Sequence, residues 1–393
     1  MTAPATPSLS PPALFWRFLK FGALAFGGPV AQIAMIRQAL VEEEHWISKD
    51  QFNRLVAVMQ VLPGPEAHEL CVHLGVRAGG RLGGLAAGLG FMAPGFVLML
   101  ALAWAYTLIL ITGTAFGALF LGVQAAVIAL IIRAVHRIGE HILANAALWA
   151  IALAAAAASL AGVSFWIVLP TAGAAHALWA GGRRLPAALA VTAAAALALT
   201  LPASLGPATT AATTSTPTTL ALFLAGLKGG LLTFGGAYTA IPFVRADTVS
   251  KGWLGDAAFL DGLGLSGLLP APLVIFVTFV GFVAAGLSGA IAITAGMFLP
   301  AFAFSLLFYE HLERVTDDPR LIHALEGIAA GVVGLIAVTL IDLTRTAATA
   351  SPNLAISAAI TATGLALLYR WKNKLAPLAA VGLGAAVGLP LLG

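Results

Sequence analysis

The feature that most constrains this chain is a series of apolar segments, each close to the 20 residues or so that a helix needs to cross the hydrocarbon core of a membrane. Charged residues make up 9% of the sequence and hydrophobic residues 60%, whereas a soluble domain carries roughly 25% charged residues. The sequence therefore predicts an all-α polytopic membrane protein. The candidate spans are residues 13–36, 82–111, 115–136, 144–160, 163–180, 185–201, 218–243, 288–309, 321–344, 352–369 and 375–392.

Two further apolar segments, 51–78 and 256–285, are each broken by a Pro-x-Pro motif, and two of the candidate spans contain an F-G-G motif. A helix break inside a membrane is tolerated only where the backbone is buried in protein or lines a cavity. Matched breaks in two halves of a chain point to the binding site of a transporter. The four motifs are F-G-G-P (Phe26–Pro29), L-P-G-P-E (Leu62–Glu66), F-G-G-A (Phe234–Ala237) and L-P-A-P-L (Leu269–Leu273).

The two halves of the chain form an internal repeat. Equivalent pairs include Lys20 and Lys228, Arg37 and Arg245, Pro63 and Pro270, Pro65 and Pro272, and Gly90 and Gly296. We predict a cytoplasmic tail (1–12), a first repeat (13–184), a connecting span and linker (185–217) and a second repeat (218–393). Because the connecting span makes the number of crossings before the second repeat odd, we expect the second repeat to be inverted in the membrane.

The broken segments could each cross the membrane once or could re-enter on the side where they began. Lys and Arg residues concentrate in cytoplasmic loops. If both segments cross, 15 of the 20 Lys and Arg residues fall on one side; if both re-enter, the pairs Arg77/Arg81 and Arg133/Arg137 move to the other side. Charge therefore favours crossing. This predicts about 13 spans in a bacterial inner membrane, with the N-terminus in the cytoplasm and the C-terminus outside.

Four sequence patterns carry a resemblance to a known family. They are F-G-G-P, the R-x8-W-I pattern of Arg37, Trp46 and Ile47, L-P-G-P-E-A-H-E-L (Leu62–Leu70) and G-G-L-x-A-G-x-x-F-x-x-P-G (Gly83–Gly95). In this order they resemble the chromate ion transporter family in its long, two-repeat form, which implies export of chromate. The second repeat departs from the first where Pro29, Gly64 and Glu66 are replaced by Ala237, Ala271 and Leu273. We therefore expect unequal roles for the two repeats.

Chromate is a tetrahedral dianion, so its site needs hydrogen-bond donors and positive charge. Half-helices that begin after Pro65 and Pro272 offer free amides and the positive ends of their dipoles. A lysine within a span suggests function, although Lys20 could extend to the interface. In the alternative interpretation, the glycines and prolines serve only helix bending. The predicted pathway residues are Lys20, Gly27, Gly28, Gln60, Pro63, Gly64, Pro65, Glu66, His68, Lys228, Gly235, Gly236, Pro270 and Pro272.

Gate or proton-coupling roles are predicted for Arg37, Glu69, His73, Gln124 and Arg245. Glu66, Glu69 and His73 share one helical face and could relay protons, or they could be satisfied polar groups. A dianion repels a carboxylate, so Glu66 is expected to orient donors, to pair with an arginine or lysine, or to carry a proton. The two arginines could attract anions at pathway mouths or anchor to acidic neighbours at Glu42–Glu44 and Asp247.

Three kinds of function follow. The first is chromate export by alternating access, driven by the membrane potential with or without proton antiport. The second is transport of sulfate or another oxyanion of similar shape and charge. The third is an integral membrane enzyme or scaffold, but the sequence contains no motif for a nucleophile, a nucleotide or a metal. We expect no catalytic residue, cofactor, metal or nucleic acid; the expected partners are an oxyanion, the lipid bilayer and, as an alternative to a monomer, a second copy in a homodimer.

Overall fold

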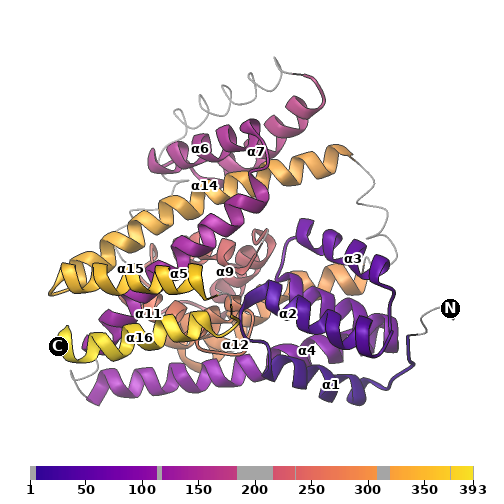
Figure 1. The fold of residues 1–393 in the computed structure, drawn as a ribbon, viewed down its shortest axis with the longest axis horizontal. Helices are drawn as coiled ribbons and strands as arrows, with labels where there is room; N and C mark the ends of the chain where they lie inside the picture. Colours follow the sequence, from indigo (N-terminus) through magenta and orange to yellow (C-terminus); the bar gives the residue numbers. More distant parts are fainter. Residues whose placement is uncertain are drawn as a thin grey trace.

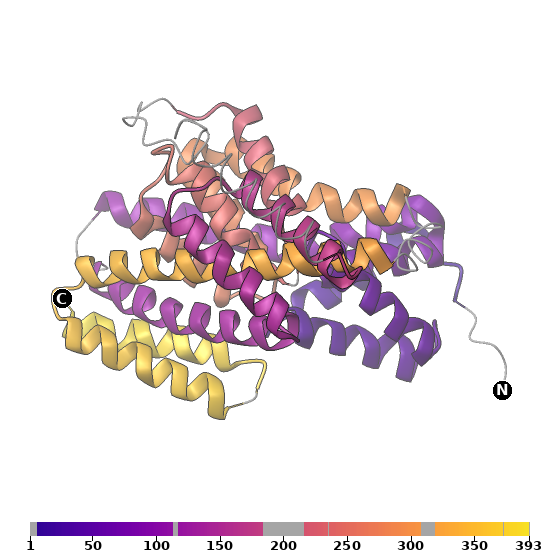
Figure 2. The same cartoon turned by 90° about the horizontal axis from the view of Figure 1, so that it is seen from above.

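The structure, a computed structural model, describes residues 6–112, 117–183, 216–234, 236–307, 319–371 and 373–392. All regular structure in these ranges is helical. The first and the last described residues lie toward opposite ends of the longest axis in both views (Figures 1 and 2). The predicted connecting span 185–201 lies outside the described residues, and so does nearly all of the linker 202–217.

Helix breaks occur at all four motifs, as predicted. The first repeat contains α1 (Pro11–Ala23), α2 (Gly28–Arg37), the π-helix η1 (Gln38–Glu43), α3 (Lys49–Val61), α4 (Glu66–Thr112), α5 (Gly117–Ile142), α6 (Ala146–Leu160) and α7 (Phe165–Ala180). The second contains α9 (Thr219–Leu231), η4 (Ala237–Ala240), α10 (Ile241–Thr248), α11 (Asp256–Gly267), η5 (Leu273–Ile275), α12 (Phe276–Leu307), α14 (Pro319–Ala350), α15 (Leu354–Arg370) and α16 (Ala376–Leu391). Figure 1 shows their arrangement.

The F-G-G-P motif reverses the chain instead of bending one continuous span. Gly27 and Gly28 both have positive φ, at 92° and 78°, a conformation that costs other residues roughly 1–2 kcal/mol. Beyond the turn, α2 runs back toward the start of α1, because Glu44 forms an ion pair with Arg17. The guanidinium of Arg17 also lies 5.0 Å from the ring centroid of Trp46.

The L-P-G-P-E motif reverses the chain in the same way. The hydroxyl of Thr6 donates a 2.8 Å hydrogen bond to the backbone carbonyl of Trp46, before α3 begins. The same hydroxyl accepts a 3.0 Å hydrogen bond from Nε of Arg77, after the break. The two ends of segment 51–78 are therefore linked through one residue, and a hydrocarbon core about 30 Å thick cannot separate them.

A third reversal lies inside α4. The backbone at Gly80 is not helical, with φ at 65°, and the arms before and after it fold against each other. A β-carbon placed on Gly75 would lie 2.7 Å from the carbonyl oxygen of Gly83, so the two arms approach this closely only because both residues are glycine. The segment after Gly80 is the long arm of α4.

The second repeat folds with the same three reversals. Lys228 of α9 and Asp247 of α10 form a 2.5 Å ion pair across the F-G-G-A turn. Across the L-P-A-P-L turn, a β-carbon on Gly262 of α11 would lie 2.5 Å from the ring of Phe279 in α12. Inside α12 the chain reverses at Gly286, where φ is 65°. The segment after Gly286 is the long arm of α12.

The prediction that these segments each cross the membrane once is therefore wrong. Segments 13–36, 51–78, 218–243 and 256–285 are helical hairpins, and the count of about 13 spans fails for these four. The reason lies in the length of the arms. A 13-residue helix such as α1 or α3 is only about 20 Å long, and the glycine and proline turns permit a reversal as readily as a kink.

The long arms of α4 and α12 occupy equivalent places in the two repeats and pack against each other. Gly84 faces Leu306 and Gly88 faces Phe302. Residue numbers therefore rise along one arm as they fall along the other, so the two arms are antiparallel. Glycine at these positions lets the partner side chain approach the backbone, as small residues commonly do between membrane helices.

Each repeat also covers a long helix of the other. α6 and α7 pack on α14, whereas α15 and α16 pack on α5, and Figure 2 shows the α15–α16 hairpin beside α5. The contacts are made through glycine: Gly122 of α5 approaches the carbonyl of Gly384 in α16, and Gly327 of α14 approaches that of Ala172 in α7. The two repeats are thus interlocked.

Among the described residues, four helical stretches are long and apolar enough to cross a membrane. They are Glu66–Leu108, Gly117–Ile142, Leu273–Leu307 and Leu321–Ala350, and α6, α7, α9, α15 and α16 are shorter apolar helices. These helices fit the predicted class, an all-helical protein that passes through the membrane several times.

Candidate functional site

The Pro-x-Pro break of the first repeat lies directly against the F-G-G break of the second. The amide of Gly64 donates a 2.9 Å hydrogen bond to the carbonyl of Thr233, the residue before Phe234. Nearby, a β-carbon on Gly95 in the long arm of α4 would lie 2.4 Å from Cβ of Ala271, in the second Pro-x-Pro motif. The fold therefore brings broken backbone from both repeats to one place.

Glu69 lies beneath the first Pro-x-Pro break. Its side chain is 0% exposed, and neither carboxyl oxygen has a hydrogen-bond partner among the described residues. A β-carbon on Gly64, where φ is 142°, would lie 2.6 Å from Oε1 of Glu69. The hydroxyl of Ser305 donates a 3.3 Å hydrogen bond to the backbone carbonyl of Glu69. Glu69 is thus enclosed between the two repeats, with its carboxyl group against the broken backbone.

The first turn of α4 combines free donors with acidic side chains. The amides of His68 and Glu69 bond to the carbonyl of Pro65, whereas those of Glu66 and Ala67 have no partner within the helix, as at any helix N-terminus. Glu66 and Glu69 are both in this turn. The first turn of α12 contains no acidic residue, so an anion near that turn meets no carboxylate from the turn itself.

His68, a predicted pathway residue, packs between the two repeats. It is fully buried, and Nε2 donates a 3.2 Å hydrogen bond to the carbonyl of Gly88. Its ring centroid lies 4.9 Å from that of Phe298 and 4.7 Å from that of Phe302. Aromatic rings of the second repeat therefore enclose this side chain of the first.

The two equivalent lysines have different surroundings. Lys20 is exposed in the last turn of α1. Lys228 is paired with Asp247, and its amine lies 4.6 Å from the ring centroid of Phe165. Lys228 is therefore held by a carboxylate, because the second repeat carries Asp247 where the first has Ala39. Its contact with a transported anion stays a prediction.

Arg137 of α5 is a site candidate that the sequence did not single out. The adjacent residue Ile138 lies 3.9 Å from the position of a β-carbon on Gly236, and Tyr238 packs on the same apolar cluster as Ile138. The guanidinium of Arg137 lies within electrostatic range of both Glu66 and Tyr238. Its side chain is exposed and forms no hydrogen bond or ion pair within the described part of the chain. Arg137 thus supplies positive charge near breaks of both repeats.

The glycine pairs are packed differently in the two repeats. A β-carbon on Gly27 would lie 2.7 Å from Cβ of Lys374, in the connection between α15 and α16, whereas one on Gly28 would have open space. The second repeat reaches the first F-G-G turn through Lys374, which is a second basic residue near a break. Gly236 has φ at 130°, and Gly235 lies outside the described residues.

Gln124, for which a gate or proton-coupling role is predicted, belongs to a buried polar cluster. Its Nε2 donates a 2.9 Å hydrogen bond to Oδ1 of Asp261, and the hydroxyl of Tyr106 donates a 2.8 Å hydrogen bond to Oδ2. Sequence inspection missed Asp261, although a carboxylate within an apolar segment is itself a functional signal. The cluster joins α4 and α5 of the first repeat to α11 of the second.

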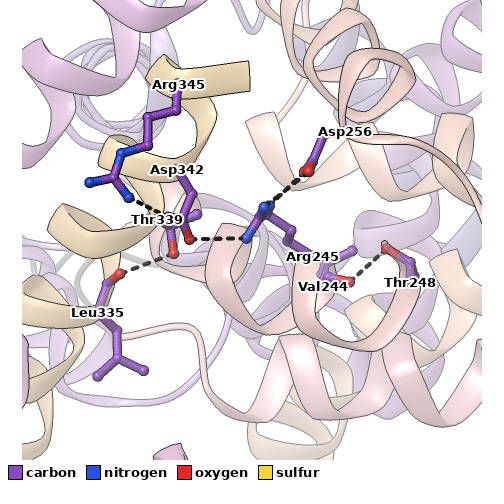
Figure 3. Close-up of polar contacts among 8 residues, drawn as sticks. All are labelled: Val244, Arg245, Thr248, Asp256, Leu335, Thr339, Asp342 and Arg345. Carbon is purple, nitrogen blue, oxygen red and sulfur yellow. Dashed lines mark hydrogen bonds and ion pairs between the residues drawn. The ribbon is translucent and has the colours of Figure 1, made fainter. Parts of the chain in front are cut away.

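Arg37 and Arg245 are both engaged by carboxylates, as the anchoring alternative predicted. Nε of Arg37 lies 3.3 Å from Oε1 of Glu42. Arg245 forms a bidentate pair with Asp256, at 2.7 Å and 3.1 Å, and Nη1 lies 3.4 Å from Oδ2 of Asp342 (Figure 3). The predicted partner Asp247 is wrong, because it pairs with Lys228. Arg245 thus ties α10 to α11 and α14.

The remaining predicted residues lie at or beside the breaks. Gln60 and Pro63 are half-buried at the end of α3, whereas Pro65, Pro270 and Pro272 are buried. Glu66 is 6% exposed and His73 is 4% exposed. The structure thus brings the Pro-x-Pro residues, Glu66 and Glu69 together and places Arg137 near them. The other neighbours described above surround Lys20, His68 and Gln124.

Comparison with known proteins assigns the family. The chromate transporter family matches residues 12–179 and 220–389. A chromate transport protein of Pseudomonas aeruginosa is 60% identical over 95% of this chain and 91% of its own length. One of Cupriavidus metallidurans is 32% identical over 95% and 92%, and a probable chromate transport protein of Synechococcus elongatus is 30% identical over 93% and 91%. No solved structure matches. These relatives are transport proteins and not enzymes, and the chain belongs to the chromate transporter family.

Proposed function

We propose that this protein exports chromate from the cytoplasm by alternating access. The observation that carries the proposal is the 60% identity, along nearly the whole chain, to a protein named for chromate transport. Matched helix breaks that meet between the two repeats support it, because transporters with repeats bind their substrates at such places. A bacterial inner membrane is the proposed location.

The proposed binding place lies where Gly64 meets Thr233. Free amides at the start of α4 and the turns of the second repeat supply donors that need no buried counter-charge. Arg137 supplies a guanidinium, which suits tetrahedral oxyanions because it can donate two parallel hydrogen bonds. Glu66, buried at 6% exposure, offsets the charge of Arg137 in this arrangement and keeps the empty site close to neutral.

We propose that the two repeats are inverted and that the four helical hairpins re-enter the membrane. Support comes from the antiparallel long arms and from the termini at opposite ends of the molecule (Figure 1). With the N-terminus in the cytoplasm and a crossing at 185–201, the outer side carries only Lys228, Arg245, Lys251 and Arg345. This distribution satisfies the positive-inside rule at least as well as the crossing topology.

Membrane potential alone is sufficient to drive export of a dianion. Moving two negative charges outward through about 100 mV releases about 4.6 kcal/mol. That energy supports a concentration ratio of roughly 10³. Proton antiport is an addition that the buried carboxyl groups permit but that the energetics do not require.

The test is chromate flux in proteoliposomes that contain only the purified protein. Membrane potential and pH gradient are imposed separately, with protein-free liposomes as the control. We expect uptake into vesicles to follow an inside-positive potential; flux that is absent or indifferent to the potential would contradict electrogenic export. Light scattering of the same purified protein decides between a monomer and a homodimer.

Sulfate or another tetrahedral oxyanion is the second candidate substrate. The donors at the breaks recognise shape and charge, which chromate and sulfate share, so these residues favour neither anion. Competition by sulfate and by molybdate against labelled chromate uptake separates the candidates. Equal competition at equal concentration would make this protein a general oxyanion transporter.

A further inference from the structure

We infer that Asp261 is a proton-binding site, formed by Asp261 of the second repeat with Tyr106 and Gln124 of the first. The inference rests on the proposed chromate transport, to which it adds the group that exchanges a proton as the transporter changes conformation. The carboxyl group lies in α11, one of the two arms joined by the L-P-A-P-L turn.

The carboxyl group is buried but is held by neutral donors. Asp261 is 4% exposed, Gln124 is 3% exposed and Tyr106 is 4% exposed. Each carboxyl oxygen accepts one hydrogen bond, from the hydroxyl of Tyr106 at 2.8 Å and from Nε2 of Gln124 at 2.9 Å. Burial of a charge without a partner ion is costly. Two neutral donors offset only part of that cost, so Asp261 can exist in both the charged and the neutral form.

The surroundings of Asp261 contain no counter-charge among the described residues. The helices that pack on α11 are α4, α5, α12, α14 and α16, together with η5, and Tyr106 is the titratable group from these elements that contacts Asp261. Arg245 and Asp342 lie near the start of α11, where Arg245 pairs with both Asp342 and Asp256. Arg133 and Arg137 are more than two turns further along α5 than Gln124.

Gln124 can serve both protonation states of Asp261. In the present arrangement its amide nitrogen donates to Oδ1, while its Oε1 is buried without a hydrogen-bond partner. When a proton from water binds Oδ1, a rotation of the amide by half a turn places Oε1 to accept that new O–H. Release of the proton to water reverses the rotation. The unsatisfied oxygen of Gln124 is the observation that points to this second state, since buried acceptors are normally bonded.

The position of the cluster connects protonation to the moving parts. α11 ends at Gly267, six residues after Asp261, and the L-P-A-P-L turn follows. Val123 and Leu130 of α5 contact α11 at Gly264 and Gly267. A change in the hydrogen bonds of Asp261 therefore changes how firmly α11, and with it the second break, is held against the first repeat.

The first test measures the proton itself, independently of transport. Infrared difference spectra of the purified protein are recorded during a pH titration, for wild type and for Asp261→Asn. We expect a protonated-carboxyl band that is present in wild type and missing in the variant. Identical bands in the two proteins would overturn the inference, whether or not chromate is transported.

The second test measures coupling in proteoliposomes. Asp261→Asn keeps the size of the side chain and resembles the neutral acid, so we expect potential-driven chromate flux to persist. An imposed pH gradient, which changes the flux in wild type, should leave the flux of this variant unchanged. Asp50→Asn, at an exposed carboxylate on α3, is the matched control and should keep the wild-type response. The inference would be overturned if Asp261→Asn kept the pH response of wild type. It would also be overturned if Asp261→Asn lost flux under all conditions and Asp261→Glu did not restore it. If wild type carries no chromate, the proposed function fails, while the infrared titration still decides the proton site.

Discussion

The amide of Gly64 and the carbonyl of Thr233 are joined by a 2.9 Å hydrogen bond that links the first Pro-x-Pro break to the second F-G-G break. The bond connects main-chain groups from residues far apart in the sequence, and no side chain takes part. Motion of one repeat relative to the other must keep this bond or break it. The contact is therefore a sensitive place at which to perturb transport.

Gly64→Ala should impair chromate transport strongly while the protein still inserts into the membrane. At φ 142° a β-carbon is strained, and it would lie 2.6 Å from Oε1 of the buried Glu69; the backbone term alone costs at least about 1–2 kcal/mol. The control is Gly382→Ala in α16, where a β-carbon meets nothing within 4 Å. Chromate flux per reconstituted protein is the measurement, and equal flux for both variants would contradict a close-packed turn.

Arg137→Gln should lower the ratio kcat/KM for chromate about 10- to 100-fold. A hydrogen bond to a charged partner contributes about 1.5–3 kcal/mol, and each 1.4 kcal/mol corresponds to tenfold. Arg137→Lys should recover part of the loss because it restores the charge without the bidentate geometry. Arg345→Gln, at an exposed arginine of α14, is the matched control. A normal ratio in Arg137→Gln would remove this residue from the site.

Glu66→Gln should change the pH dependence of chromate flux if the first repeat takes part in proton coupling. The divergence between Glu66 and Leu273 motivates this prediction, and Glu69→Gln tests the enclosed carboxyl beside it. Flux is measured at several symmetrical pH values at fixed potential. Two variants with the rate and the pH profile of wild type would show that neither carboxyl carries a coupled proton.

The hairpin topology predicts that Glu43 and Arg81 lie on the same side of the membrane as the N-terminus. Single cysteines at these positions, introduced into a Cys71→Ala background, should be blocked together by a membrane-impermeant maleimide added to one side. A cysteine at Arg345 should be blocked only from the opposite side. Native Cys71 is fully buried, so wild type should be unlabelled. Labelling of positions 43 and 81 from opposite sides would restore the crossing topology.

Arg245→Ala should lower stability by about 1–3 kcal/mol, since it leaves Asp256 and Asp342 without their partner in a partly exposed setting. The side chain of Arg245 is 20% exposed. Thermal unfolding in detergent measures the loss, and a double-mutant cycle with Asp256→Ala isolates the pair (Figure 3). If the cycle shows no coupling while transport is lost, Arg245 would be part of a gate and not an anchor.

The helix breaks could be predicted from sequence because they are local. Glycine and proline act on the backbone at their own positions, so the breaks near Gly27 and Pro63 follow from residue type. The direction of the chain after each break could not be predicted in this way. It depends on tertiary contacts such as that of Thr6 with Trp46 and Arg77.

Charge counting also could not reveal the reversals. Each repeat contains two hairpins in a row, and replacing two crossings by two re-entries leaves every later loop on the same side. The positive-inside rule therefore hardly distinguishes two crossings from two re-entries in each repeat. Re-entry of 51–78 is unfavourable by this rule only if 13–36 crosses the membrane. Arg137 was missed for a related reason, since the positive-inside rule already explains a basic residue at that position and no further role needs to be assumed.

The exchange of covering helices between the repeats limits how such a fold can arise. α5 is covered by α15 and α16, and α14 by α6 and α7, so a polypeptide with a single repeat would expose the glycine-rich face of its longest unbroken helix. In the inverted topology that we propose, it could complete itself only by pairing with a copy inserted into the bilayer in the opposite orientation. Under the same proposal, gene duplication and fusion, with one added crossing between the copies, would fix those two orientations permanently. The two copies can then diverge in sequence. Lys228 pairs with Asp247, for example, whereas the equivalent Lys20 is exposed.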